Sequence, residues 1–403
     1  MKNNRTMTIG AVVIIALVAI FYFATQQKKV AEDIKVGILL GFTGPIESLT
    51  PDMASGAELA FNEASNSGEL LGGSKITILR ADSTCVDSAA ATAAAEDLLS
   101  QGMTAMMGAD CSGVTGAVAT NVAVPNGFAM ISPSATSPGL STLEDKGLFF
   151  RTAPSDARGG QVLADITNDK GIKSVAITYV NSDYGLGLAD VYKAAVEAYG
   201  ITVTTMASHE SDKADYSADV GVLSSAGGDA LAVLGYLDNA GGHIIEGSLD
   251  SGAFDTFVLS DGMIGDSLTD RFGSDLNNSF GSMPGSLGEG AQLFKSVAEA
   301  GGINASVYVG ESYDAAALIV LAMQAGESSD KGSIAENIMS VANAPGEKIM
   351  AGEIAKGLKL LASGKEIDYQ GATDVTFTDV GEAEGAFIEK GISGGKFTDV
   401  AQR

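Results

Sequence analysis

The chain has 403 residues, of which 45% are hydrophobic and 18% charged, and its formal net charge is −26. This acidity nearly excludes nucleic acid as a partner, because a phosphate backbone requires a basic surface, and we interpret the carboxylates as a solvated exterior. The hydrophobic content excludes a disordered chain, and the length is sufficient for two folded lobes.

The first 32 residues have the form of an export signal. Lys2 and Arg5 precede an apolar run from Ile9 to Ala24, as in a secretory signal peptide. The run is shorter than the roughly 20 residues of a membrane span, yet longer than a typical signal core. We therefore expect a signal peptide or an uncleaved N-terminal membrane anchor over residues 1–32. In either case the chain should be exported to the periplasm or another extracytoplasmic location, and tethered there if the segment is retained.

Short apolar strands then alternate with amphipathic helices, which predicts a parallel α/β architecture. The first series has strands at Ile34–Gly41, Lys75–Ala81, Met103–Gly108 and Phe128–Ser132, and helices at Asp52–Asn66 and Asp87–Gln101. The second series starts near Ser155, with strands at Ser174–Val180, Ile201–Met206, Ala230–Leu234 and Thr256–Ser260, and helices at Leu186–Tyr199 and Tyr216–Ala226. The two series predict two doubly wound, Rossmann-like lobes. In such sheets ligands bind at the carboxyl ends of the strands.

The two cysteines, Cys85 and Cys111, lie 26 positions apart. In an exported chain a disulfide is favoured over two buried free thiols. Closing a loop of that size would stabilise the fold by about 3 kcal/mol in the chain-entropy model. A metal site is disfavoured, because neither of the two histidines, His209 and His243, lies near a cysteine in the sequence.

Three loops that follow strands of the first lobe are small and rich in hydroxyl groups: residues 41–45, 109–113 and 132–138. Such loops expose backbone N–H groups and hydroxyls, which suit an anionic group no larger than a carboxylate. Helix capping explains any one of them equally well. Three on one lobe favour a binding site.

The corresponding loops of the second lobe contain two tyrosines, Tyr184 and Tyr236, and one acid, Asp261. An aromatic wall with an acid would complement a ligand that bears an ammonium group. The alternative is two ordinary, partly buried tyrosines and a turn-forming aspartate before Gly262. Their positions after successive strands favour the site.

Several short segments share their order and spacing with one known family: 34–38, 43–45, 56–60, 110–112, 131–136, 183–185 and 313–315. Together they resemble the Leu/Ile/Val-type periplasmic binding proteins of branched-chain amino-acid ABC transporters, which have the type I periplasmic binding fold. The likeness spans roughly residues 33–390. It implies a non-enzymatic, monomeric protein without a cofactor, which captures a small amino acid and interacts with the permease subunits of a transporter.

The resemblance also implies a domain organisation. The first lobe would comprise residues 33–153 and 283–379, and the second lobe residues 154–282 with a return over 380–403. The chain would then cross between lobes near residues 153, 282 and 380, and these hinges would permit closure around the ligand.

For the site, the resemblance implies that the Ser112 and Thr136 hydroxyls and nearby N–H groups, in the loop that includes Ala135, hold the ligand α-carboxylate. The ammonium would meet the Ser134 carbonyl and Asp261. Tyr184 and Tyr236 would close over the ligand, and Tyr308 would face its side chain. The family's disulfide also falls on Cys85 and Cys111.

Two departures from the family bear on specificity. Leu49 stands where Leu/Ile/Val binders tend to have an aromatic residue, and Asp261 stands where they have Glu. Other small amino acids, amides and urea-like solutes therefore stay open as ligands.

Two other classes of protein compete with a binding protein. An enzyme is disfavoured: residues 185–190 resemble a dinucleotide-binding turn, but Asp190 occupies the position of its third small residue, and we expect no catalytic residue, metal or cofactor. A ligand-sensing receptor domain would suit a retained anchor. Because the chain ends at Arg403 without a signalling region, we favour transport.

Overall fold

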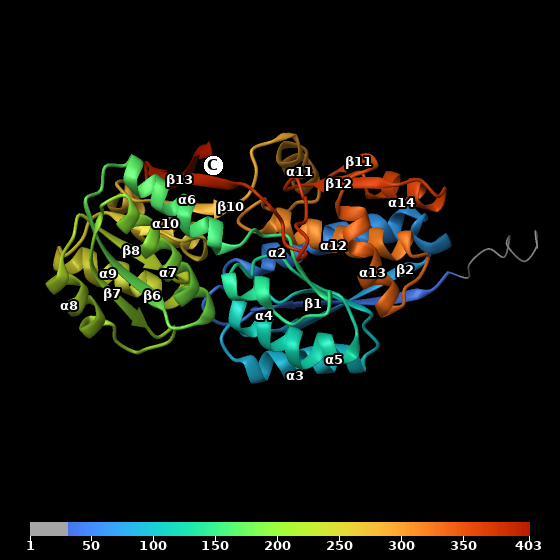
Figure 1. Ribbon diagram of the computed structural model, residues 1–403, viewed down its shortest axis with the longest axis horizontal. Helices are drawn as coiled ribbons and strands as arrows, with labels where there is room; N and C mark the ends of the chain where they lie inside the picture. Colours follow the sequence, from blue (N-terminus) through green and yellow to red (C-terminus); the bar gives the residue numbers. More distant parts are fainter. Residues whose placement is uncertain (1–30) are drawn as a thin grey trace, which may run out of the picture.

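The computed structural model describes residues 31–403, which form two α/β lobes side by side (Figure 1). The expected export segment lies almost entirely outside these residues. Within residues 31–403, no helix is both long enough and apolar enough to cross a membrane.

The first lobe is built on five parallel strands in the order β2-β1-β3-β4-β5. The strands are β1 (Asp33–Leu40), β2 (Lys75–Asp82), β3 (Ala105–Gly108), β4 (Met130–Ser132) and β5 (Phe149–Arg151). On one face lie α2 (Thr50–Ser67) and α12 (Val309–Ala325), and on the other lie α3 (Ser88–Ser100), α4 (Ser112–Val118) and α5 (Val124–Asn126) (Figure 1). Strands β1, β3, β4 and β5 are mostly buried because both faces of the sheet are covered, whereas the edge strand β2 is polar in part and only half-buried.

The second lobe is built on seven strands in the order β14-β13-β10-β9-β8-β6-β7. The parallel strands are β6 (Ser174–Val180), β7 (Thr202–His209), β8 (Ala230–Leu234), β9 (Phe257–Leu259) and β10 (Phe280–Pro284). Antiparallel pairing adds β13 (Phe387–Ser393) and β14 (Lys396–Gln402). The helices of this lobe are α6 (Asp156–Asp169), α7 (Asp183–Ala198), α8 (Ser217–Ala226), α9 (Gly242–Ser251) and α10 (Asp266–Phe272).

The remaining elements follow β10 and extend the first lobe. They are α11 (Glu289–Ala300), α13 (Lys331–Ala342), β11 (Glu347–Met350), α14 (Ile354–Ala362) and β12 (Ile367–Gly371). The chain thus passes between the two sheets three times: between β5 and α6, between β10 and α11, and between β12 and β13.

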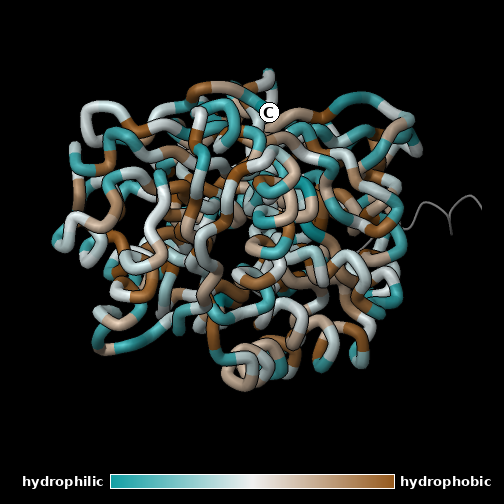
Figure 2. The backbone as a smooth tube through the Cα atoms, turned by 60° about the vertical axis from the view of Figure 1, so that its left-hand side comes forward, coloured by the Kyte–Doolittle hydropathy of each residue, from teal (hydrophilic) through white to brown (hydrophobic). Residues whose placement is uncertain are grey.

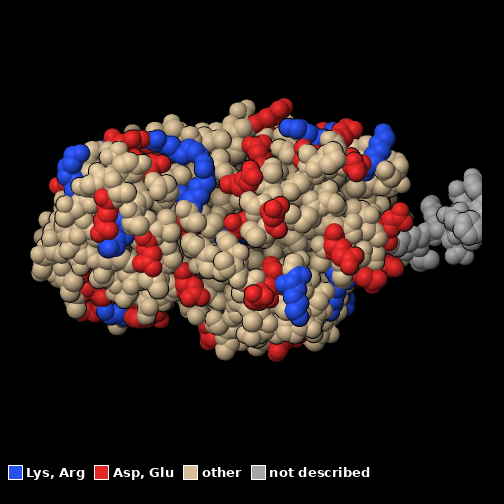
Figure 3. Space-filling model, viewed as in Figure 1, with Lys and Arg blue, Asp and Glu red and all other residues tan. Residues whose placement is uncertain are grey.

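The predicted fold class, two doubly wound α/β lobes, is confirmed. Strands β6 and β8 begin and end at the predicted residues, and the other predicted strands differ from the observed ones by a few residues at their ends. Hydrophobic segments run through the interior of both lobes, whereas hydrophilic ones lie mostly in outer loops (Figure 2). Acidic side chains are spread over the visible face of both lobes, as the net charge predicts (Figure 3).

The two lobes meet at loops that follow strands of each sheet. The Ser48 N–H donates to Asp238 Oδ2 (2.8 Å), and the Asp238 N–H donates to the Pro45 carbonyl (3.2 Å). At another point, Ser137 Oγ donates to the Asp183 carbonyl (3.0 Å). These contacts hold the carboxyl ends of the two sheets face to face.

Candidate functional site

One buried acid, Asp110, ties together the loops at the carboxyl ends of β1, β2 and β3. Its Oδ2 accepts from the Gly41 N–H (2.5 Å), and its Oδ1 accepts from Ser83 Oγ (2.8 Å) and the Cys111 N–H (3.0 Å). Burial raises the pKa of Asp110, whereas these hydrogen bonds favour its charged form. Asp110 therefore acts as a scaffold for the first-lobe loops.

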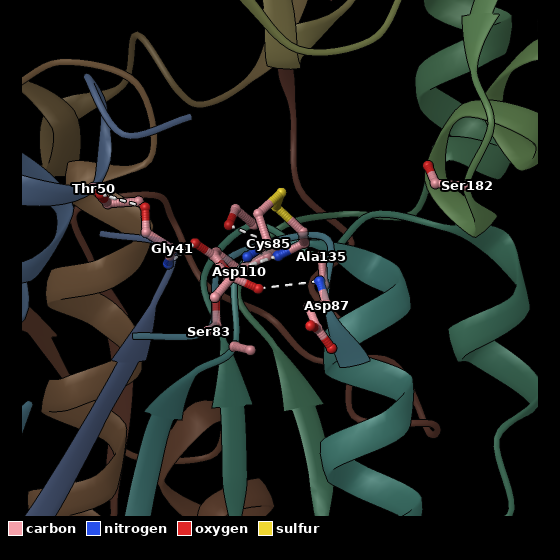
Figure 4. The surroundings of a disulfide bond; sticks show 12 residues. Gly41, Thr50, Ser83, Cys85, Asp87, Asp110, Ala135 and Ser182 are labelled. Atoms are coloured by element: carbon pink, nitrogen blue, oxygen red, sulfur yellow. Dashed lines mark hydrogen bonds between the residues drawn. A yellow bond between two sulfur atoms is a disulfide. The ribbon is translucent and has the colours of Figure 1, made fainter. Parts of the chain in front are cut away.

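The predicted disulfide between Cys85 and Cys111 is present. It joins the loop after β2 to the residue that precedes α4, and Asp110 lies beside it (Figure 4). In this view Ser182 of the second lobe faces the disulfide loop from the opposite side. The disulfide thus braces the first-lobe wall of the space between the lobes.

The serine-rich loop after β4, residues 132–138, is hydrogen-bonded to the loop after β3. Ser132 Oγ donates to the Ala109 carbonyl (2.5 Å), Ser134 Oγ donates to the Asp110 carbonyl (3.1 Å), and the Ser137 N–H donates to Ser112 Oγ (3.1 Å). The two predicted anion-binding loops, 109–113 and 132–138, therefore form one unit.

A buried cation, Arg151, holds the same loop in place. Its Nη1 donates to the carbonyls of Ala135 (3.0 Å) and Ser137 (2.9 Å), on either side of Thr136. Its other guanidinium atoms bond to Glu382, in the segment between β12 and β13. Arg151 therefore connects the loop to one of the three inter-lobe segments.

On the second lobe, Tyr184 and Tyr236 stack with ring centroids 5.2 Å apart. Tyr184 lies in the first turn of α7, which Ser182 caps by accepting from the Gly185 N–H (3.2 Å). Only glycine fits at position 185, since a Cβ there would lie 2.0 Å from the Val180 carbonyl oxygen. The tight turn after β6 thereby directs Tyr184 toward the first lobe.

Asp261 lies at the centre of the junction and is contacted from both lobes. Tyr184 Oη donates to its Oδ1 (2.7 Å), and Tyr308, at the start of α12 in the first lobe, donates to its Oδ2. Burial raises the pKa of Asp261, and the two phenol hydrogen bonds oppose that shift. Tyr308 has a left-handed backbone (φ 62°), a conformation that costs a non-glycine residue about 1–3 kcal/mol.

These residues enclose a small cavity between the lobes. The volume accessible to the centre of a water molecule in it is about 30 Å³. Seven of the nine predicted ligand-binding residues line it: Leu49, Ser112, Ser134, Tyr184, Tyr236, Asp261 and Tyr308. The disulfide residue Cys111 lines it as well. Ala135 and Thr136 are fully buried behind it and do not line it. Ile46 and Met53 line it as well, and the sequence analysis did not single them out.

The sequence analysis also missed Asp156, in the first turn of α6. Asp156 is 3% exposed and lines a narrow space next to the cavity together with Asp261. Within residues 31–403, its Oδ2 and the Thr136 hydroxyl have no hydrogen-bond partner. Burial and the charge of Asp261 raise the pKa of Asp156 well above its usual range. Acidic residues are common in the first turn of a helix, so the position of Asp156 in the sequence does not predict that it is buried beside the cavity.

The arrangement is therefore a closed space lined by Ser112, Ser134, Asp110 and Tyr308 from the first lobe and by Asp261, Tyr184 and Tyr236 from the second. It has the features of a site for a small zwitterion. A family model described as periplasmic binding protein matches residues 33–355. The chain belongs to this family.

Curated relatives of this periplasmic binding protein include two from Brucella melitensis. Leu/Ile/Val-binding protein homolog 1 is 30% identical over 329 residues, which cover 80% of this chain and 85% of the relative. Homolog 3 is 31% identical over 237 residues, and that match covers 56% of this chain and 60% of the relative.

Solved structures share the fold of this periplasmic binding protein. The leucine-binding protein LivK from Thermotoga maritima has a TM-score of 0.75 at 20% identity, and the match covers 92% of this chain and 98% of LivK. LivJ from Streptococcus pneumoniae, solved with isoleucine, has a TM-score of 0.75 at 21% identity, with 92% and 99% covered. A solute-binding protein from R. palustris, solved with benzoate, has a TM-score of 0.74 at 16% identity, with 92% and 96% covered. At these identities the fold is shared, and the ligand is decided by the residues of the site.

Across residues 31–403, no three or more His, Cys, Asp or Glu side chains are placed to hold a metal ion together.

Proposed function

We propose that this periplasmic binding protein captures a small α-amino acid, of the branched-chain type or a close relative, between its lobes and delivers it to an ABC transporter. The observation that supports this most is Asp261, a buried acid that lines a closed cavity together with Ser112 and Ser134 of the other lobe. The two charged groups of an amino-acid zwitterion are complementary to that carboxylate and to those hydroxyls. The names of the Brucella relatives agree with this ligand class.

The ligand α-ammonium would take the place of the phenol hydroxyls at Asp261. An ammonium group has three donors and a full charge, so it satisfies a buried carboxylate better than two neutral hydroxyls do. The Ser134 carbonyl would accept a further ammonium hydrogen. The Ser112 hydroxyl, which lines the cavity, would bind the α-carboxylate. The Thr136 hydroxyl and the N–H groups near Ala135, which do not line the closed cavity, would join it once the lobes open.

Capture would proceed by lobe closure around the three inter-lobe segments near residues 153, 282 and 380. The open form would bind the ligand on the first-lobe loops, and Tyr184, Tyr236 and Asp261 would then complete the site from the second lobe. Because Tyr308 belongs to the first lobe and Asp261 to the second, their hydrogen bond stabilises the closed arrangement. The closed monomer would be the form that the permease recognises, outside the cytoplasm and without any catalytic step.

Thermal-shift measurements on the full 403-residue chain test this function, with the twenty amino acids, small amides and urea as probes. A ligand at 100 times its Kd adds about 2.7 kcal/mol to the stability of the folded state, so a binder raises the Tm. We expect shifts with a few amino acids only.

The matched variants are Asp261→Ala and Asp270→Ala, the second an exposed acid on α10. Removing one partner of a buried charge pair costs about 2–5 kcal/mol, so Asp261→Ala should weaken binding roughly 30-fold or more, and Asp270→Ala should not. Unchanged affinity in Asp261→Ala, or no shift with any amino acid, would contradict the proposal.

A further inference from the structure

A second and much larger cleft lies between the lobes beside the cavity at Asp261. The centre of a water-sized sphere has about 410 Å³ to move in it, against about 30 Å³ in the cavity. Its walls come from α2, α11 and the start of α12 on the first lobe, and from α10, β10, β13 and β14 on the second. The function proposed above uses none of this space.

Leu49 belongs to the wall that the two spaces share, because its side chain lines both. It is 6% exposed, and its Cδ2 would lie 3.1 Å from a Cβ placed on Gly265 of the second lobe. An aliphatic side chain at this point is flexible and smaller than an aromatic ring. A ligand in the cavity could therefore extend past Leu49 into the cleft.

Glu311 is the one acid of the cleft that is both deeply buried and unpaired. It lines the cleft, and the residue is 4% exposed. Within residues 31–403, no other residue donates a hydrogen bond to its carboxyl, which meets only its own backbone N–H. The nearby buried acid Asp314, in contrast, accepts hydrogen bonds from Tyr369 Oη (2.7 Å) and the Ala372 N–H (2.8 Å).

The burial of Glu311 has a cost that the fold does not offset. Burial raises the pKa of Glu311 to about 8, which expresses how poorly its surroundings stabilise a negative charge. A buried polar group with too few partners destabilises a protein, and a bound ligand that supplies a partner is one explanation for such a group.

The charge of the cleft indicates the sign of that partner. Its charged side chains are Asp52, Asp266, Glu311, Asp399, Lys295 and Lys390. Lys390 and Asp399 form an ion pair with each other, and Lys295 is exposed. Acidic groups therefore exceed basic ones around Glu311, and a cation is favoured there.

We propose that the cleft binds the cationic end of a long amino-acid side chain, such as that of arginine or lysine, with Glu311 as its counter-ion. The α-amino and α-carboxyl groups of the same ligand would occupy the cavity at Asp261. Tyr308, which contacts Asp261, and Glu311 are three residues apart on α12, about 4.5 Å along the helix axis. A side chain of several methylene groups spans that distance. This inference rests on the proposed function and names the substrate class of the same site.

Isothermal titration calorimetry of the full 403-residue chain with isosteric ligand pairs tests the inference. Arginine and citrulline differ in the charge of the terminal group, and lysine and norleucine differ in its presence. We expect arginine to bind at least tenfold more tightly than citrulline, and lysine at least tenfold more tightly than norleucine.

The key variant is Glu311→Gln, which keeps the size of the side chain and removes its charge. The arginine-to-citrulline preference should fall to near unity in Glu311→Gln and persist in Glu336→Gln, an exposed acid on α13. A second variant, Leu49→Phe, narrows the passage between the cavity and the cleft. It should weaken the binding of arginine at least tenfold more than the binding of alanine, whose side chain does not extend past residue 49.

The outcomes separate the two proposals. Equal binding of arginine and citrulline, or an unchanged preference in Glu311→Gln, would overturn the role of Glu311. Binding of leucine without binding of arginine or lysine would overturn the extended site and leave the proposed function standing. Absence of binding with every amino acid would refute the proposed function and the inference together.

Discussion

Substitution of Arg151, which forms a buried ion pair with Glu382, should lower the stability of this protein more than most single substitutions. Arg151 is 1% exposed and donates to Glu382, to Ser141 Oγ and to the carbonyls of Ala135 and Ser137. Arg151→Met keeps most of the volume but removes the cation from Glu382, whose carboxylate then keeps only the Ser141 hydroxyl as a donor, and removes the donor of two carbonyls. Loss of one partner of a buried pair costs about 3–5 kcal/mol.

That loss can be converted into a melting temperature. At about 2.1 cal/mol/K per residue, the 373 residues from 31 to 403 have an unfolding entropy near 0.8 kcal/mol/K, so Arg151→Met should lower the Tm by about 4–6 °C. Differential scanning calorimetry measures this shift directly. Ligand affinity should also fall, because both lost carbonyl contacts flank Thr136 in the proposed binding loop.

The control is the exposed pair of Arg80 and Glu58, whose side chains are 44% and 28% exposed. Arg80→Met should cost at most about 1 kcal/mol, because solvent already stabilises both charges. In the double variant Arg151→Met/Glu382→Gln, part of the lost stability should return, since no unpaired charge stays buried. The reasoning would be refuted if Arg151→Met and Arg80→Met lowered the Tm equally.

Three other perturbations have outcomes that follow from the structure. Replacing Cys85 and Cys111 by serine should lower the free energy of unfolding in guanidinium by about 3 kcal/mol, and reductant should have the same effect on the unaltered chain but none on the variant. Burial lowers the pKa of His209 from 6.5 to about 4, so between these values the unfolded chain binds a proton that the folded chain does not. The free energy of unfolding should therefore decrease by up to about 3 kcal/mol as the pH is lowered from 6.5 to 4. His209→Gln should flatten that part of the stability profile, and an unchanged slope would contradict this account. Burial and Asp261 raise the pKa of Asp156, so the ionised group weakens the fold as pH rises above the ordinary range of aspartate. Asp156→Asn should reduce that loss of Tm between pH 4 and 8, and a steeper loss would count against it.

Most of the secondary structure could be predicted because its signal is local. A strand covered on both faces is a continuous apolar run that ends at turn residues, and β6 and β8 were located to the residue on that basis. Beyond residue 260 no helix or strand was predicted, and the resemblance to periplasmic binding proteins, which the family match supports, implied only which lobe those residues join.

Part of the candidate site could be predicted for a related reason. The carboxyl ends of parallel strands meet at one edge of a sheet, so loops that are distant in sequence become neighbours in space. Tyr184 and Asp261 are 77 residues apart and share a hydrogen bond, and both were selected by this rule. Whether these residues contact a ligand stays a prediction.

The sequence by itself determined the fold class, the two series of strands, the favoured disulfide and the loops that face each other, because each depends on periodicity, turn chemistry or the order of strands. Only the tertiary structure decided that Asp156 Oδ2 is buried without a hydrogen-bond partner, that no other residue donates to the buried Glu311 carboxyl, and that Arg151 meets Glu382 across 231 residues. In the sequence these are ordinary charged residues near helix or strand ends. Their surroundings come from segments of both lobes, and burial of a charge is a property of that packing rather than of the residue or its neighbours in the chain.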